Sequence, residues 1–169
     1  MDSQRGDGRG KAGTLESELM FLVVGELINS SREEIKRALE ERDETCVRRL
    51  ARAQAEAGAC VIDLNTAQSL ERELEDIEGL IEVVEHELGK EARISIDTAD
   101  PRVMRGAAEV CSAPAIINSI SNEPSELELI QWAAESDVDV IALAEPHLIS
   151  FSNTSHIGSS YFMWSVFWG

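Results

Sequence analysis

The stretch Ile94-Ser95-Ile96-Asp97-Thr98 predicts a short buried strand that ends in a carboxylate. Further apolar runs also lead to a polar side chain, and these are Val23–Glu26 leading to Asn29, Val61–Asn65 and Ile116–Ile120. Nearly continuous apolar runs are typical of strands that are buried on both faces, as in parallel sheets. Because ligands bind at the carboxyl ends of parallel strands, these side chains predict one polar site at that edge.

Segments with helical spacing separate these runs. Apolar side chains from Leu70 to Leu88 recur every three or four residues, which predicts an amphipathic helix. Ser31 and Glu34 match a capping box, and Asp43 and the pair Asp100-Pro101 are also typical helix starts. Strands that alternate with helices predict an α/β fold with a parallel sheet and right-handed crossovers. Periodicity leaves open a doubly wound sheet or part of a closed (β/α)8 barrel.

The strand–helix pattern predicts one domain over residues 19–146, with a fifth strand at 138–144. Residues 1–18 are rich in glycine and mixed charge, so we expect a flexible leader. Residues 147–169 contain no Asp, Glu, Lys or Arg and are rich in aromatic side chains. We expect this aberrant tail to be unrelated to the fold, with a membrane-surface or partner-binding segment as the alternative.

The 169-residue chain carries a formal net charge of −17, which argues against nucleic acid or an anionic membrane as a partner. No apolar run approaches the roughly 18 residues that a membrane span needs, and the start does not resemble a signal peptide. We therefore expect a cytoplasmic protein. Three widely spaced cysteines without a Cys-x-x-Cys pair argue against disulfides and a zinc site, and no metal is expected.

A carboxylate beside a carboxamide can recognise a planar heterocycle whose edge presents N–H donors next to acceptors, such as a pterin or guanine. Asp97 and Asn118 fit this role. Polar residues on the other strands would extend the network, and these are Glu26, Asn29, Asp63 and Asn65. The alternative is that Asp63 and Asp97 merely cap the turns that follow them. The sequence contains no GxGxxG, Walker or GxSxG pattern, so neither a phosphate loop nor a nucleophile elbow is indicated.

Four motifs resemble the pterin-binding domain family, and these are Gly25-Glu26-Leu27-Ile28-Asn29, Gly58–Asn65, Ile96-Asp97-Thr98 and Ile117–Ser121. The first and last are most similar to methyltetrahydrofolate:corrinoid protein methyltransferases and to the folate domain of cobalamin-dependent methionine synthase. The resemblance implies a (β/α)8 TIM barrel with a reduced pterin at its carboxyl-end face. It also implies that Asp97 and Asn118 bind the pterin ring. Asn29, Asp63 and Asn65 match further motif positions, and no catalytic residue is assigned.

The resemblance implies that the N5 methyl group of methyltetrahydrofolate passes to a Co(I) corrinoid (cobalamin) carried by a partner protein. A full barrel takes roughly 250 residues, whereas about five strand–helix units are recognisable. We therefore expect a truncated barrel with impaired activity and with open sheet edges that could form a homo-oligomer. The alternatives are a non-catalytic binding or assembly module and a dihydropteroate synthase-like enzyme. The phosphate-binding Lys and Arg of the latter have no candidates in the sequence.

Overall fold

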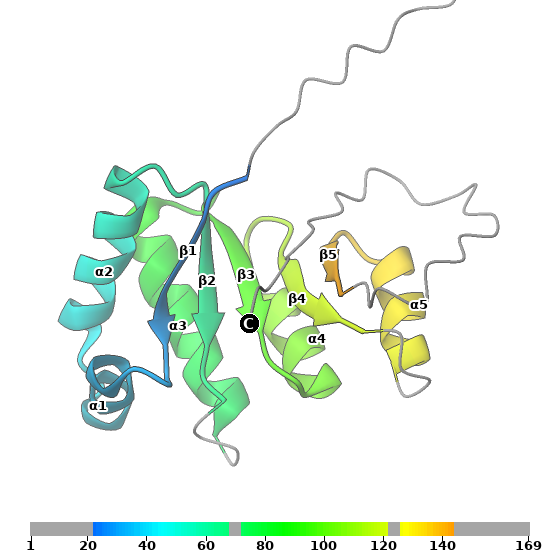
Figure 1. Ribbon diagram of the computed structural model, residues 1–169, viewed down its shortest axis with the longest axis horizontal. Helices are drawn as coiled ribbons and strands as arrows, with labels where there is room; N and C mark the ends of the chain where they lie inside the picture. Colours follow the sequence, from blue (N-terminus) through cyan, green and yellow to red (C-terminus); the bar gives the residue numbers. More distant parts are fainter. Residues whose placement is uncertain (1–21, 68–71, 122–125, 144–169) are drawn as a thin grey trace, which may run out of the picture.

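The computed structural model describes residues 22–67, 72–121 and 126–143, and its helices and strands alternate along the chain (Figure 1). The strands are β1 (Val24–Asn29), β2 (Val61–Asn65), β3 (Arg93–Asp97), β4 (Ile116–Ile120) and β5 (Asp139–Ala142). The helices are α1 (Glu33–Glu41), α2 (Glu44–Glu56), α3 (Glu73–Leu88), α4 (Pro101–Val110) and α5 (Leu127–Glu135). The predicted order of elements is confirmed. The predicted leader and aromatic tail lie outside the described residues.

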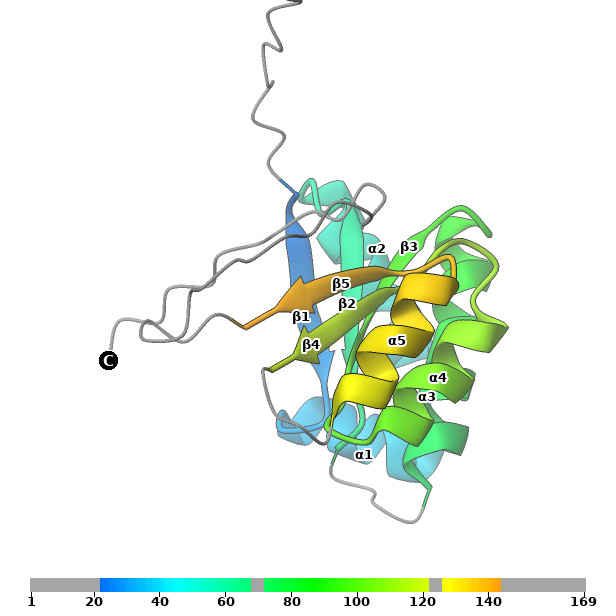
Figure 2. The same ribbon diagram turned by 90° about the vertical axis from the view of Figure 1, so that its right-hand side faces the viewer.

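The five strands form one parallel sheet in the order β1-β2-β3-β4-β5. Helices α2 to α5 all lie on the same face of this sheet, as the two views in Figures 1 and 2 show. A doubly wound sheet would reverse its strand order and carry helices on both faces. Sequential order with helices on one face is the arrangement of a (β/α)8 barrel segment. The structure therefore decides the alternative that the sequence left open, in favour of the barrel type.

The alternation of side chains along each strand divides the sheet into a helix-facing side and an open side. The helix-facing side is apolar and fully packed, for example at Leu64, Ile96 and Ile117, which are all completely buried. On the open side, a smaller apolar cluster contains Val61 and Ile116 near the amino ends of the strands. The polar side chains of the open side follow this cluster toward the carboxyl ends of the strands.

Helix α4 begins where the sequence predicts. Pro101 is its first residue, and the Asp100 side chain accepts a hydrogen bond from the backbone N–H of Arg102 at 2.9 Å. Proline fits the first helical position because its missing N–H would be unpaired there in any case. Side-chain hydrogen bonds from Arg102, reinforced by the backbone N–H, hold the pKa of Asp100 below its ordinary value.

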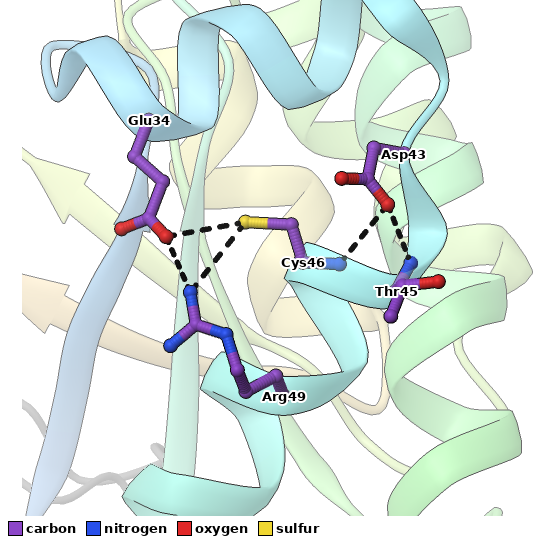
Figure 3. A network of polar contacts seen from close by, with 5 residues as sticks. All are labelled: Glu34, Asp43, Thr45, Cys46 and Arg49. Carbon is purple, nitrogen blue, oxygen red and sulfur yellow. Dashed lines mark hydrogen bonds and ion pairs between the residues drawn. The ribbon is translucent and has the colours of Figure 1, made fainter.

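The capping box predicted at Ser31 and Glu34 is wrong. Helix α1 has Arg32 as its N-cap, and no side chain caps the first turn. The Glu34 carboxylate instead accepts a hydrogen bond from Arg49 and lies 3.6 Å from Cys46 Sγ, which joins α1 to α2 (Figure 3). An ion pair with a neighbouring helix has therefore replaced the local contact that the sequence pattern suggested.

Asp43 is confirmed as the N-cap of α2. Its Oδ1 accepts hydrogen bonds from the backbone N–H groups of Thr45 at 3.0 Å and Cys46 at 3.3 Å (Figure 3). Burial, together with the charge of Glu34, raises the pKa of the Cys46 thiol. The Cys46 thiol is thus held in its protonated, weakly nucleophilic form.

The other cysteines of the described part are also free thiols. Burial raises the pKa of Cys111 to about 12, so this thiol stays protonated at neutral pH.

None of the helices in the described ranges combines the length and the apolar composition that crossing a bilayer requires. Within those same ranges, no group of three His, Cys, Asp or Glu side chains is placed to hold a metal ion.

The cap of α2 provides a test of this local structure. We expect Asp43→Ala to lower the free energy of unfolding by about 1 kcal/mol, because two backbone N–H groups lose their acceptor. Asp43→Asn keeps an acceptor oxygen and should change the free energy of unfolding by only about a few tenths of a kcal/mol. Urea denaturation followed by circular dichroism measures both variants. Equal losses in the two variants would contradict the capping role.

Candidate functional site

Four of the predicted polar residues form two hydrogen-bonded pairs on the open side of the sheet, whereas Glu26 and Asn29 lie on β1 beside them. The four come from three neighbouring strands, with Asp63 and Asn65 on β2, Asp97 on β3 and Asn118 on β4. Asp97 and Asn118 are direct register partners. Residues two apart on a strand face the same side, so Asp63 and Asn65 emerge on one face of β2.

Asn65 holds the Asp97 carboxylate in place. The Nδ2 group of Asn65 donates a hydrogen bond to Asp97 Oδ2 at 2.8 Å. Its Oδ1 accepts hydrogen bonds from Ser30 Oγ at 3.3 Å and from the backbone N–H of Ala67 at 3.2 Å. With donors on one side and a carboxylate on the other, only one orientation of the amide satisfies all three contacts. Within the described residues, Asp97 Oδ1 accepts no hydrogen bond.

Asp63 plays the same part for Asn118. Its Oδ1 accepts hydrogen bonds from Ser95 Oγ at 2.6 Å and from Asn118 Nδ2 at 3.0 Å. The sequence placed Asp63 near the end of its strand, but β2 continues to Asn65 and Asp63 is only 2% exposed. Because the Asn118 amide points its nitrogen at Asp63, its oxygen is left without a donor among the described residues.

Asn29 lies beside this group in the sheet, because its register partner is Asn65. Its Oδ1 nevertheless accepts a hydrogen bond from the backbone N–H of Ser31 at 2.9 Å, which closes a local turn. Turn capping therefore describes Asn29. It does not describe Asp63 or Asp97, which accept hydrogen bonds in the described part from side chains of other strands.

The chain matches the family model described as "Pterin binding enzyme" over residues 25–156. It belongs to the pterin-binding enzyme family. The methylcorrinoid:tetrahydrofolate methyltransferase of Eubacterium limosum is 33% identical over 110 residues, which cover 65% of this chain and 40% of the relative. The crystal structure of 7,8-dihydropteroate synthase from Vibrio fischeri ES114 is similar at 25% identity and a TM-score of 0.48, covering 76% of this chain and 46% of that one. The chain spans less than half the length of either relative.

On the open side of this sheet, two side-chain oxygens are available on adjacent strands. Asp97 Oδ1 and Asn118 Oδ1 have no donor in the described part, and their backbones are register partners. Adjacent strands of a sheet lie about 4.8 Å apart. The two oxygens can therefore accept hydrogen bonds from neighbouring N–H groups on one edge of a flat ring.

Sequence reasoning missed Ser95, which is completely buried and donates the shorter of the two hydrogen bonds that Asp63 accepts in the described part. Ser95 is the register partner of Asp63. Strand alternation was the signal that could have identified it, because residue 95 must face the same side as Asp97. A serine within an otherwise apolar strand needs a hydrogen-bond partner, and Asp63 supplies it.

Burial raises the pKa of Asp63 to about 6, and the nearby carboxylates of Asp97 and Glu26 add to this effect. Hydrogen bonds from Ser95 and Asn118 stabilise the ionised form and limit the rise. The folded state thus binds a proton more tightly than the unfolded state, in which the pKa is near 4. Protonation of Asp63 stabilises the fold below pH 4, and this contribution is lost as the pH rises through about 6.

We expect Asp63→Asn to remove this pH dependence, because the amide is neutral and its oxygen can still accept from Ser95. Relative to the unsubstituted chain, the variant should gain up to about 3 kcal/mol in free energy of unfolding between pH 4 and pH 7. Urea denaturation at several pH values measures this difference. A difference between the two proteins that stays constant over this range would show that Asp63 titrates normally.

Proposed function

We propose that the chain binds a reduced pterin through Asp97 and Asn118 and serves in methyl transfer between N5 of a tetrahydrofolate and a corrinoid carried by a partner protein. The observation that carries the proposal is the pair of side-chain oxygens, Asp97 Oδ1 and Asn118 Oδ1, that no described residue occupies. Membership of the pterin-binding family supports the pterin. The name of the E. limosum relative supports tetrahydrofolate and the corrinoid.

The chemistry of these acceptors fits the pterin ring. A 2-amino-4-oxo pterin presents an amino group and a ring N–H side by side, and both are donors. An ionised Asp97 accepts one or both of these, and Asn118 Oδ1 accepts beside it. Asn65 and Asp63 hold these two side chains in place through their own hydrogen bonds. Supporting contacts of this kind fix a binding group before the ligand arrives.

The role of this chain in the reaction is to bind and orient the folate. When it is present, the corrinoid supplies the group that accepts or donates the methyl. A tertiary amine is a poor leaving group, so release of the methyl from N5 requires a proton or a strong hydrogen bond at that atom. The relative is named for transfer in the opposite direction, from methylcorrinoid to tetrahydrofolate. Both directions pass through the same transition state, so the same binding residues serve each of them.

The open face of the described sheet sets an expectation for affinity. This sheet has five strands, and the proposed site lies on its open side. A site on one open sheet face leaves a bound ligand in contact with water, which weakens each polar contact. We therefore expect the 169-residue chain to bind methyltetrahydrofolate weakly.

Calorimetric titration with methyltetrahydrofolate tests the proposal. We expect Asp97→Asn to weaken binding at least about ten-fold, because a charged acceptor becomes a neutral amide whose nitrogen cannot accept. Absence of binding by the unsubstituted chain would contradict the function itself. Binding that Asp97→Asn leaves unchanged would contradict the assignment of Asp97.

Asp43→Asn is the matched control for this experiment. It changes the net charge by the same amount, but Asp43 caps α2 and makes no contact with the site. Its affinity for methyltetrahydrofolate should equal that of the unsubstituted chain. A loss of affinity in both variants would point to the overall charge of the protein and not to a specific contact.

A further inference from the structure

Strand β1 contains an irregularity next to the site. Its register against β2 shifts between Gly25 and Ile28. Two residues of β1, Glu26 and Leu27, therefore lie opposite a single residue of β2, Asp63. This arrangement is a β-bulge, which inserts one extra residue and leaves part of the hydrogen-bond ladder unpaired.

The bulge changes which way the end of β1 faces. Without it, strict pairing onward from Gly25 would align Ile28 with Asn65 and place its apolar side chain on the open side. With the bulge, Ile28 is completely buried in the helix-facing core. Asn29 becomes the register partner of Asn65 instead. The bulge thus brings the polar end of β1 beside the residue that holds Asp97.

Gln54 of α2 supplies the hydrogen bond that the bulge takes away. Its Oε1 accepts from the backbone N–H of Leu27 at 2.7 Å. The Gln54 side chain is buried, with 5% exposure, and its Nε2 has no hydrogen-bond partner within the described residues. A buried donor without a partner lowers stability, so an apolar side chain would pack at lower cost. The retained amide is explained by the acceptor that it provides to Leu27.

Gly25 is the complement of Gln54. A Cβ atom at position 25 would lie 2.6 Å from Gln54 Oε1 and 2.8 Å from its Cδ, which is too close for either contact. The glycine is therefore required by the space that the amide occupies, and not by a left-handed backbone, since its φ is not positive. Gly25 and Gln54 act as a pair, because one leaves the room that the other fills.

We propose that Gln54 is a positioning residue for the pterin site, whose amide locks the β1 bulge and so fixes the Glu26–Asn29 edge against Asp63 and Asn65. This inference rests on the proposed function. It gives a role to Gly25, the first residue of the Gly-Glu-x-x-Asn motif, that the pterin contacts do not explain. The influence of the Glu26 charge on Asp63 agrees with a bulge that directs Glu26 toward the site.

The test uses the full 169-residue chain. Gln54→Leu keeps a side chain of similar size but removes the acceptor. We expect amide exchange of Leu27, followed by NMR, to become at least about ten-fold faster. We expect affinity for methyltetrahydrofolate, measured by calorimetry, to fall about ten-fold, the loss typical of one disturbed hydrogen bond. Gly25→Ala should produce both effects by displacing the amide.

Two controls separate positioning from stability. Val47 lies on the same helix and is 3% exposed. Val47→Ala removes two buried methyl groups and leaves the residues of the bulge unchanged. It should lower the melting temperature but leave Leu27 exchange and affinity unchanged after correction for the folded fraction. In the Gln54→Ala background, Gly25→Ala should cost less than it does alone, because the two closest clashing atoms, Oε1 and Cδ, are gone and only the Cβ contact at 3.0 Å remains.

The outcomes distinguish the inference from the function beneath it. If the unsubstituted chain binds no methyltetrahydrofolate, the proposed function is overturned and the positioning role with it, whatever Leu27 exchange shows. If the chain binds and Gln54→Leu speeds exchange but leaves affinity unchanged, Gln54 is only structural and the inference alone is overturned. Unchanged exchange of Leu27 in Gln54→Leu overturns it as well. Loss of both protection and affinity in Gln54→Leu and Gly25→Ala, but not in Val47→Ala, supports it.

Discussion

The arrangement of the site depends on one buried carboxylate, that of Asp63, which accepts hydrogen bonds from neutral groups. Asp63 is 2% exposed, and among the described residues it accepts hydrogen bonds from the Ser95 hydroxyl and the Asn118 amide. An amide that turns its nitrogen toward a carboxylate must turn its oxygen away from it. The buried carboxylate thus turns the Asn118 oxygen away from itself, and no described residue donates to that oxygen. Asn65 is oriented in the same way by Asp97, with its oxygen turned to Ser30 and Ala67.

The open side of the sheet is graded along the strand direction. An ion pair between Arg93 and Asp139 bridges β3 and β5 at their amino ends. The apolar cluster around Val61 and Ile116 lies near those ends, and the carboxylates and amides follow toward the carboxyl ends. The charge of Arg93 is therefore balanced by Asp139 at the amino ends of the strands. The carboxyl-end edge presents acceptors, which suits a ligand whose recognised edge consists of N–H donors.

Strand β1 illustrates how a helix residue can determine the geometry of a sheet edge. The Gln54 side chain reaches from α2 to the bulged backbone, and Gly25 leaves the space for it. The same bulge buries Ile28 and brings Asn29 into register with Asn65. The hydrogen bond from Leu27 N–H to Gln54 thus links the core to the site, and we expect a substitution of Gln54 to affect both sides of the sheet.

Local signals in the sequence determined much of this protein. They predicted the alternation of strands and helices, the buried strand that ends at Asp97, and the helix starts at Asp43 and Asp100. They also identified the polar residues that gather at the carboxyl ends, because strand order and alternation follow from runs of a few residues. The family motifs extended this to a pterin-binding barrel, and the family match agrees with it.

The tertiary structure alone decided the remaining features, because they depend on contacts between residues that are distant in sequence. The sequential strand order and the position of helices α2 to α5 on one face of the sheet indicate the barrel type and not a doubly wound sheet. Contacts with Ser95 of β3 and Asn118 of β4 bury Asp63 within its strand. The Glu34 carboxylate accepts a hydrogen bond from Arg49 instead of forming the predicted cap. The bulge held by Gln54 set the register of Asn29, which no local pattern encodes, since a one-residue slip preserves composition but exchanges the two faces of a strand.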